Sequence, residues 1–333
     1  MFSVVNSLSK FKIKQIQYMD LSIIIINWNT RDLIIDCLNS IKENLVAEPA
    51  LQVETFVIDN ASSDDSVSAI KNQFPWVKLM ENHQNVGFAK ANNQGIKLSS
   101  GKFILLLNSD AYLQPNSLNF MIDALQKNNA VGAIGVKILN PDGTFQASYA
   151  SFPTIASEVI NLIGLANYVI GPYAPSPSPI KDEKASPVDW VSGAAIVIRR
   201  NVIDDIGLLD EGYFLYSEET DLCWRIWKHG WQVWYLPNIH ISHLGGASSK
   251  KSPVVNYSRL YHSKLRFFSK NYGNFYREFF KVILVIITIL RLFIWQFQII
   301  IPTAQSKQIY KSKFKQEKNL LLTLFKIIPE NSF

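Results

Sequence analysis

The chain has 333 residues, of which 48% are hydrophobic and 18% are charged. This composition excludes an intrinsically disordered chain, which needs few apolar residues and high charge, and the two cysteines are too few for a disulfide framework or a cysteine-rich zinc site. Residues 250–333 carry 15 Lys and Arg against 3 Asp and Glu, a charge of +12, whereas residues 1–249 carry −6. An acidic body with a basic tail predicts two surfaces with different partners.

Residues 1–20 contain three lysines but no apolar run of signal-peptide length, which predicts a short basic leader. From Leu21 onward, strand-like and helix-like segments alternate. Apolar, β-branched runs predict strands at 21–26, 53–58, 77–80, 103–107 and 131–139. Helical spacing of apolar residues predicts helices at 30–44, 64–74 (capped by Ser63), 88–98 and 115–127. This alternation predicts a mostly parallel sheet with helices on both faces, an α/β fold.

The pattern loosens after Pro141. A segment rich in Pro, Gly and Ser predicts a loop at 171–184. Further on, we expect a strand at 190–198 around Gly193, a helix at 218–229 and a strand at 231–235. We therefore predict one α/β domain over residues 21–250.

Residues 251–333 predict a basic, apolar helical region. The segment 279–301 is very apolar, and its polar residues Arg277, Lys281, Thr288, Arg291 and Gln298 fall within an arc of about 100° on a helical wheel. A narrow polar stripe is typical of a helix that lies in the membrane interface. A spanning helix and a helix docked on a soluble protein are the alternatives. The interface is favoured because Arg291 at mid-bilayer would cost about 2.5–3.5 kcal/mol.

A second apolar patch, at 320–328, makes an anionic membrane surface a better partner for this tail than nucleic acid. We expect a cytoplasmic protein, peripheral or monotopic at the inner face of the cell membrane.

Polar clusters follow three of the predicted strands: Asn27-Trp28-Asn29, the segment 59–64, and Asn108-Ser109-Asp110. In an open parallel sheet, ligands bind beyond the carboxyl ends of the strands, so these clusters predict a ligand site. The chain has neither a Gly-x-Gly-x-x-Gly after the first strand nor a P-loop, which argues against a dinucleotide dehydrogenase and a P-loop enzyme. A bound diphosphate would then be neutralised most simply by Mg²⁺ or Mn²⁺, with Asp110 as a ligand.

These motifs, in order and at plausible spacing, resemble inverting nucleotide-sugar glycosyltransferases of family two, in particular the rhamnosyltransferase-like branch that builds bacterial surface polysaccharides. The resemblance covers about residues 21–250. It rests on the three clusters above and on four further segments: Asn85 to Gly95, Trp190 to Ala195, Glu218 to Arg225, and His243 to Ser248. It implies a GT-A fold with the donor nucleotide at the strand ends.

The resemblance also implies roles for single residues. The nucleoside would be held by Asn27, Asn29, Asp59 and Asn60. A carboxylate such as Asp59 can accept from a pyrimidine N–H, which favours UDP or dTDP. The nucleotide or diphosphate region would be lined by Asn85, Gly87 and Asn93. The Asp-x-Asp position is occupied by Asn108, Ser109 and Asp110, where Asp110 is the expected metal ligand, with His243 near the diphosphate and metal.

Inversion needs a base on the acceptor hydroxyl, opposite the leaving diphosphate. The family pattern places Glu219 there, with Glu218 and Asp221 as alternatives, although Asp221 and Arg225 are four residues apart and can pair on a helix. Trp190 and Gly193 match the acceptor side. The predicted enzyme moves a sugar, from dTDP-rhamnose or a UDP-sugar, to a lipid-linked glycan. The alternative is a catalytically degenerate sugar-nucleotide-binding or scaffold protein.

Overall fold

The computed structural model describes residues 19–172, 174–176, 184–246, 252–300 and 307–325. The predicted leader therefore lies almost wholly outside the described residues. So do parts of the loop at 171–184, of the motif at 243–248 and of the apolar patch at 320–328.

The core is one twisted sheet that agrees with the predicted α/β class. Its main strands are β1 (Leu21–Asn27), β2 (Val53–Asp59), β3 (Lys78–Glu81), β4 (Phe103–Asn108), β5 (Ala111–Leu113), β6 (Val131–Leu139), β11 (Ala195–Arg199) and β12 (Gln232–His243). They lie in the order β3-β2-β1-β4-β11-β6-β12-β5. Only β11 and β5 run against the other six, so the sheet is mostly parallel.

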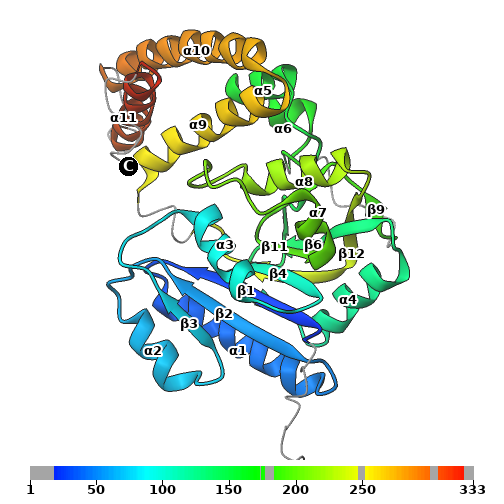
Figure 1. Ribbon diagram of the computed structural model, residues 1–333. Helices are drawn as coiled ribbons and strands as arrows, with labels where there is room; N and C mark the ends of the chain where they lie inside the picture. The colour runs from blue at the N-terminus through cyan, green and yellow to red at the C-terminus, as the bar shows by residue number, and fades with distance from the viewer. Residues whose placement is uncertain (1–18, 173, 177–183, 247–251, 301–306, 326–333) are drawn as a thin grey trace, which may run out of the picture.

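Two helical layers cover the sheet (Figure 1). Alternate residues of β1 point to opposite faces, and all seven are buried, as a continuous β-branched run predicts. Ile23 and Ile25 pack toward α1 (Arg31–Ala47), α2 (Ser66–Gln73) and α4 (Ser117–Lys127). Ile24 and Ile26 pack toward α3 (Phe88–Leu98), α7 (Arg200–Ile206) and α8 (Glu218–Lys228).

Several predicted boundaries are wrong. Helix α2 begins at Ser66 rather than residue 64, and Ser63 does not cap it; Asp65 at its start is left-handed, and the Asp64 carboxylate accepts from the Ser66 N–H instead. Helix α4 begins at Ser117, after Pro115.

The predicted strand at 190–198 is two strands. The first, β10 (Trp190–Val191), pairs with β8 (Tyr149–Ala150) in a separate two-stranded sheet, whereas β11 lies in the main sheet. Residues 192–194 carry the chain from one sheet to the other. Strand β12 runs on from the predicted 231–235 to His243, past a register shift after Leu236, so His243 ends a strand of the main sheet. Two short strands complete the pairing, β7 (Phe145–Gln146) on β6 and β9 (Ser186–Pro187) on β12.

Three C-terminal helices form a second layer above the α/β domain, together with α5 (Ile155–Leu162) and α6 (Ala166–Val169) (Figure 1). They are α9 (Pro253–Asn271), α10 (Asn274–Ile300) and α11 (Lys307–Leu324). Their own small core includes Leu265, Phe268, Phe280, Leu284 and Leu320.

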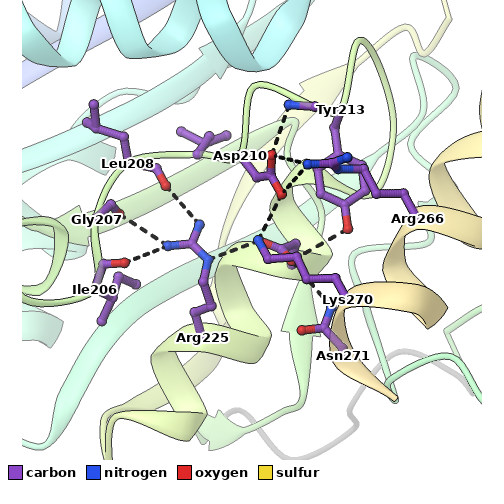
Figure 2. Close-up of polar contacts among 12 residues, drawn as sticks. Ile206, Gly207, Leu208, Asp210, Tyr213, Arg225, Arg266, Lys270 and Asn271 are labelled. Carbon is purple, nitrogen blue, oxygen red and sulfur yellow. Dashed lines mark hydrogen bonds and ion pairs between the residues drawn. The ribbon is translucent and has the colours of Figure 1, made fainter. Parts of the chain in front are cut away.

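Helix α9 is docked on the α/β domain by a cluster of charges, shown in Figure 2. The Asp221 carboxylate is completely buried and lies 2.9 Å from both Arg225 Nε and Lys270 Nζ. Asp210 pairs with Arg266 at 2.8 Å and with Lys270 at 2.9 Å. A buried carboxylate with two cationic partners is expensive to disrupt, so this cluster fixes α9 in place.

Helix α10 presents its polar stripe to the protein and its apolar side outward. Arg291 pairs with Glu317 of α11 at 2.9 Å, donates to the Tyr257 hydroxyl at 3.0 Å and bonds the Leu162 carbonyl. The Arg291 charge is therefore balanced within the protein itself. The outward side exposes large apolar residues, among them Phe275, Phe279, Val282, Ile286, Phe293 and Phe297. Among the described residues, α10 is the one helix long and apolar enough to cross a membrane.

Candidate active site

A cavity of about 300 Å³ lies where the carboxyl ends of β1, β4 and β12 meet the start of α8. Strand β4 runs into Asn108, Ser109 and Asp110, and β12 ends in His243. The opposite wall holds Glu218 and Glu219, with the segment 192–194 beside them and the loop 214–216 before them. Helix α9 adds Asn256 and Arg259. Polar residues thus converge on one edge of the sheet, as predicted, and they come from segments near the start of the α/β domain and near its end.

The Asp110 and His243 side chains face each other, with Oδ1 and Nε2 3.2 Å apart. His243 Nδ1 lies 2.6 Å from Gln146 Oε1, an atom that only accepts, so Nδ1 carries a proton. The Gln146 amide is oriented by its Nε2, which donates to Asn140 Oδ1 at 2.8 Å. In a neutral imidazole, Nε2 then keeps its lone pair, which Asn108 Nδ2 approaches at 3.2 Å. The Asp110 carboxylate and this ring nitrogen are both ligand types that a divalent cation accepts.

Within the ranges that the structure describes, no group of three His, Cys, Asp or Glu side chains could hold a metal ion. The pair of Asp110 and His243 still fits a divalent cation that takes its remaining ligands from diphosphate and water oxygens, as Mg²⁺ and Mn²⁺ do in nucleotide sites. A histidine ligand is normally fixed through its other ring nitrogen, and Gln146 occupies that position.

Glu218 and Glu219 begin α8, where the helix dipole favours negative charge. Burial nevertheless raises the pKa of Glu218, helped by the charge of Glu219, and burial likewise raises the pKa of Glu219. One carboxylate oxygen of each has no hydrogen-bond partner among the described residues. Tyr216 and Ser217, just before them, are left-handed, with φ of 72° and 66°. Such strain in non-glycine residues is typical of functional sites.

The predicted nucleotide-binding residues divide into two groups. Those that line the cavity are Asn60, Asn85, Asn108, Ser109 and Asp110. The structure does not bring the others to it: Asn27, Asn29, Asp59, Gly87 and Asn93 are absent from the described lining.

The second group shapes the turns around the cavity. Asp59 accepts from the Asn27 amide at 2.7 Å and from the Ser62 N–H at 2.8 Å, and Asn29 accepts from the Ser63 N–H at 2.6 Å. Asn93, on α3, bonds the backbone of Leu209 at both ends of its amide.

Gly87 supports the cavity wall through its backbone. Its φ is +89°, and a Cβ there would lie 2.9 Å from Phe214, so this close approach requires glycine. Asn85 accepts from the Gly87 N–H at 3.0 Å, and the next residue, Phe88, donates its N–H to the Phe214 carbonyl at 2.7 Å.

Of the three candidate acids and the two predicted acceptor-side residues, some line the cavity and others do not. Asp221 is held in the docking cluster with Arg225, as the four-residue spacing predicts, and is not among the lining residues. Gly193 packs on Glu219, since a Cβ there would contact its side chain at 3.5 Å. Trp190 lines a neighbouring cavity of about 520 Å³ that shares Tyr216 and Glu219 with the first one.

Sequence reasoning missed Trp28, Phe214, Arg259 and Gln146. Trp28 stands between two assigned asparagines, and the alternation of side chains at a strand end places it in the cavity instead of them. The aromatic-rich segment Tyr213-Phe-Leu-Tyr216, which precedes Ser217 and the acidic pair, is the signal that points to Phe214. Arg259 was assigned to the membrane-facing tail, yet it is the one Lys or Arg among the described residues lining this cavity.

Comparison with known proteins places this geometry in a family. The model of glycosyl transferase family 2 matches residues 22–207. Over 243 residues the chain is 26% identical to an N-acetylglucosaminyl-diphospho-decaprenol L-rhamnosyltransferase of Mycobacterium tuberculosis, covering 68% of this chain and 77% of that protein. It is 28% identical over 218 residues to a low-salt glycan biosynthesis hexosyltransferase of Haloferax volcanii, covering 64% of each.

Solved structures agree on the fold. A mannosyltransferase from Pyrobaculum calidifontis, in complex with GDP-Man and Mn²⁺, superimposes with a TM-score of 0.55 at 13% identity, over 93% of this chain and 87% of that one. GalNAc-T7 with UDP, GalNAc and Mn²⁺ gives 0.51 at 14% identity, over 68% of this chain and 44% of that one. The GT-A fold and the rhamnosyltransferase-like resemblance are confirmed, and the chain belongs to glycosyl transferase family 2, whose members are glycosyltransferases that use a nucleotide-sugar donor.

Proposed function

We propose that this enzyme transfers a sugar, with inversion, from a pyrimidine nucleotide-diphosphate donor to a lipid-linked acceptor of a bacterial polysaccharide. dTDP-rhamnose is the first donor candidate, because the chain is 26% identical to a mycobacterial L-rhamnosyltransferase, and a UDP-sugar is the second. The observation that carries the proposal is the half-buried Glu219 carboxylate, which has one buried oxygen without a hydrogen-bond partner among the described residues and lines the same cavity as Asp110 and His243.

Glu219 is the proposed base. It takes the proton of the acceptor hydroxyl while that oxygen forms a bond to C1 of the donor sugar. The bond from C1 to the diphosphate breaks on the opposite face, and the nucleotide diphosphate leaves with the electron pair. A carboxylate whose pKa is raised by burial is a stronger base, which suits this task. Gly193 leaves room beside Glu219 for the acceptor, and Trp190 lines the adjacent cavity.

The donor would lie along Asn60, Asn85, Asn108 and Ser109. Mg²⁺ or Mn²⁺, held by Asp110 and His243, would supply positive charge to the leaving diphosphate. Arg259 adds a second positive charge to the cavity, and its guanidinium is held 4.0 Å from the centre of the Phe214 ring. The cationic group that a P-loop lysine would provide in other enzymes comes here from a C-terminal helix.

The catalytic domain is proposed to end near residue 250, with residues 251–333 as the membrane-associating region. The outward face of α10 carries Phe279, Val282, Ile286 and Phe293, all at least 49% exposed. Large apolar patches on a soluble protein mark contact surfaces, and a lipid interface suits one of this length. We place the enzyme at the cytoplasmic face of the membrane, where its lipid-linked acceptor is found.

The test is a donor screen. The full chain is incubated with Mn²⁺, a set of dTDP- and UDP-sugars and a short lipid-linked acceptor, and nucleoside diphosphate release is measured. The anomeric configuration of the product is then read by NMR. We expect one preferred donor, inversion, and turnover abolished by EDTA. Retention of configuration would refute Glu219 as a base, and tight donor binding without any turnover would favour the scaffold alternative.

A further inference from the structure

A second, larger cavity lies between the catalytic domain and the C-terminal helices. Its volume is about 760 Å³, and it shares Asn85, Phe214 and Arg259 with the active-site cavity. Four cationic side chains line it, Arg259, Arg266, Arg277 and Lys281, and no Asp or Glu appears among its described lining residues. A half-enclosed space with this charge favours an anionic ligand.

The four cationic side chains differ in how far partners within the protein neutralise their charge. Arg266 is paired with Asp210 at 2.8 Å, so its charge is largely used in the docking cluster. Arg259 bonds the Asn256 side chain, a neutral partner, and burial lowers its pKa. Among the ion pairs of the described residues, Arg277 takes part in one, with its exposed neighbour Glu278 at 3.4 Å, and Lys281 takes part in none. Three charges are therefore available to a ligand.

Arg277 and Lys281 stand one turn apart on α10, and this helix also carries the exposed apolar face. On the same turns, Phe275, Phe279 and Val282 are 77%, 49% and 57% exposed. The stripe of cations thus faces the cavity along the edge of an apolar surface. Farther along the stripe, Arg291 pairs with the buried Glu317, whereas Arg277 and Lys281, at the end of α10 that lines the cavity, have no buried acidic partner among the described residues.

We propose that this cavity binds the diphosphate of a polyprenyl-diphosphate-linked acceptor, through Arg259, Arg277 and Lys281, with the lipid chain leaving along the apolar face of α10. The ligand class follows from the cations and the apolar face lying side by side. A soluble anion would contact only the cations and a neutral lipid only the apolar face, whereas an anionic lipid contacts both. Because Arg259 belongs to both cavities, the sugar attached to that diphosphate would lie at their shared wall. This inference rests on the proposed function only in taking the acceptor as lipid-linked.

The decisive experiment measures binding without turnover. Farnesyl diphosphate, a short and soluble polyprenyl diphosphate, is titrated into the full chain by calorimetry with no donor present. The test variant is Arg277→Gln with Lys281→Gln, since both side chains are partly exposed and glutamine suits a helix. The matched control is Lys311→Gln with Lys315→Gln on α11, two exposed lysines with the same spacing and the same change in net charge.

We expect the test variant to weaken farnesyl diphosphate binding about 10- to 100-fold, as loss of charged hydrogen bonds does, and the control to stay within about twofold. Lys281→Arg should retain binding, which shows that the charge matters rather than the fold. Equal weakening by both double variants would overturn the site. Inorganic pyrophosphate binding as tightly as farnesyl diphosphate would overturn the lipid assignment, and so would equal competition by phosphatidylglycerol bicelles.

A kinetic arm separates this inference from the proposed function. With the acceptor sugar presented on a polyprenyl diphosphate, the test variant should lower kcat/KM about 10- to 100-fold with the donor KM unchanged. With the same sugar on an uncharged alkyl chain, it should match wild type, and a comparable loss there would count against the site. If no sugar is transferred at all but the binding result holds, the proposed function fails and the site stands.

Discussion

The clearest test of the acidic segment is Asp221→Asn, which keeps the size of the side chain and removes its charge. The wild-type side chain is 0% exposed and faces Arg225 and Lys270, each at 2.9 Å. Removing one partner of a buried pair costs about 3–5 kcal/mol. We expect the low end, about 3 kcal/mol, because Arg225 keeps three backbone carbonyls and Lys270 keeps Asp210.

The assay pairs thermal unfolding with turnover per folded molecule. At about 2 °C per kcal/mol for a chain of this length, Tm should fall by about 6 °C. Turnover below the transition should change less than about twofold, whereas loss of a general base costs about 10²–10⁴-fold. Asp210→Asn is the control, a carboxylate in the same cluster with a 16% exposed side chain, and it should destabilise less. A stable Asp221→Asn protein with a hundredfold loss of turnover would make Asp221 the base and refute this reasoning.

Three further outcomes follow from the site and the docking cluster. Glu219→Gln should lower turnover about 10²–10⁴-fold with little change in donor affinity; in wild type, where burial raises the pKa of Glu219, the rate should rise with pH as this carboxyl loses its proton, and the variant should lack that limb. Gln146→Leu should weaken Mn²⁺ binding about 10- to 100-fold, measured by EPR, with turnover recovering at high Mn²⁺, whereas Asp110→Asn should not recover; unchanged Mn²⁺ affinity in Gln146→Leu would contradict the role given to the His243 contact. Although burial alone raises the pKa of Asp210, hydrogen bonds from Arg266 and Lys270 lower it from 3.8 to about 2, so its stabilisation is complete above pH 3.8 and is lost as pH falls toward 2. Urea unfolding should show wild type losing about 1 kcal/mol more than Asp210→Asn between pH 5 and pH 2, after allowance for solvent screening; equal losses would mean that the pair does not act through charge.

The sequence was sufficient to predict the elements whose buried residues form a pattern within one short segment. The run at β1 and the helix Phe88–Leu98 follow directly from apolar periodicity, and the motif at the end of β4 lies at the sheet edge where topology requires it. The direction of a side chain at a turn is harder. Asn27 and Asp59 bond each other across two adjacent strands, which a pattern read along one strand does not reveal.

The contribution of the tail to the site could not be predicted, for a physical reason. Arg259 reaches the cavity because α9 is docked by long-range contacts, among them the pairing of Lys270 with Asp221, a contact between residues 49 apart. Charge and hydropathy predict the kind of environment that suits a helix, but they do not predict which face of that helix packs against the rest of the protein. The same limit applies to Arg291, because a helical wheel does not show that its partner is Glu317 of α11.

The contact between Gly87 and Phe214 has a consequence for how the two substrates are handled. The segment that carries Asn85 and the segment that leads into the acidic pair are tied by the Phe88 N–H to Phe214 carbonyl bond, at 2.7 Å, and by a packing distance that only glycine allows. The segment proposed to line the donor side and the segment that leads into the acidic pair are thus tied together, and displacement of either carries the other. If one substrate shifts this unit on binding, the affinity of the other substrate changes as well, and by reciprocity the factor is the same in both directions.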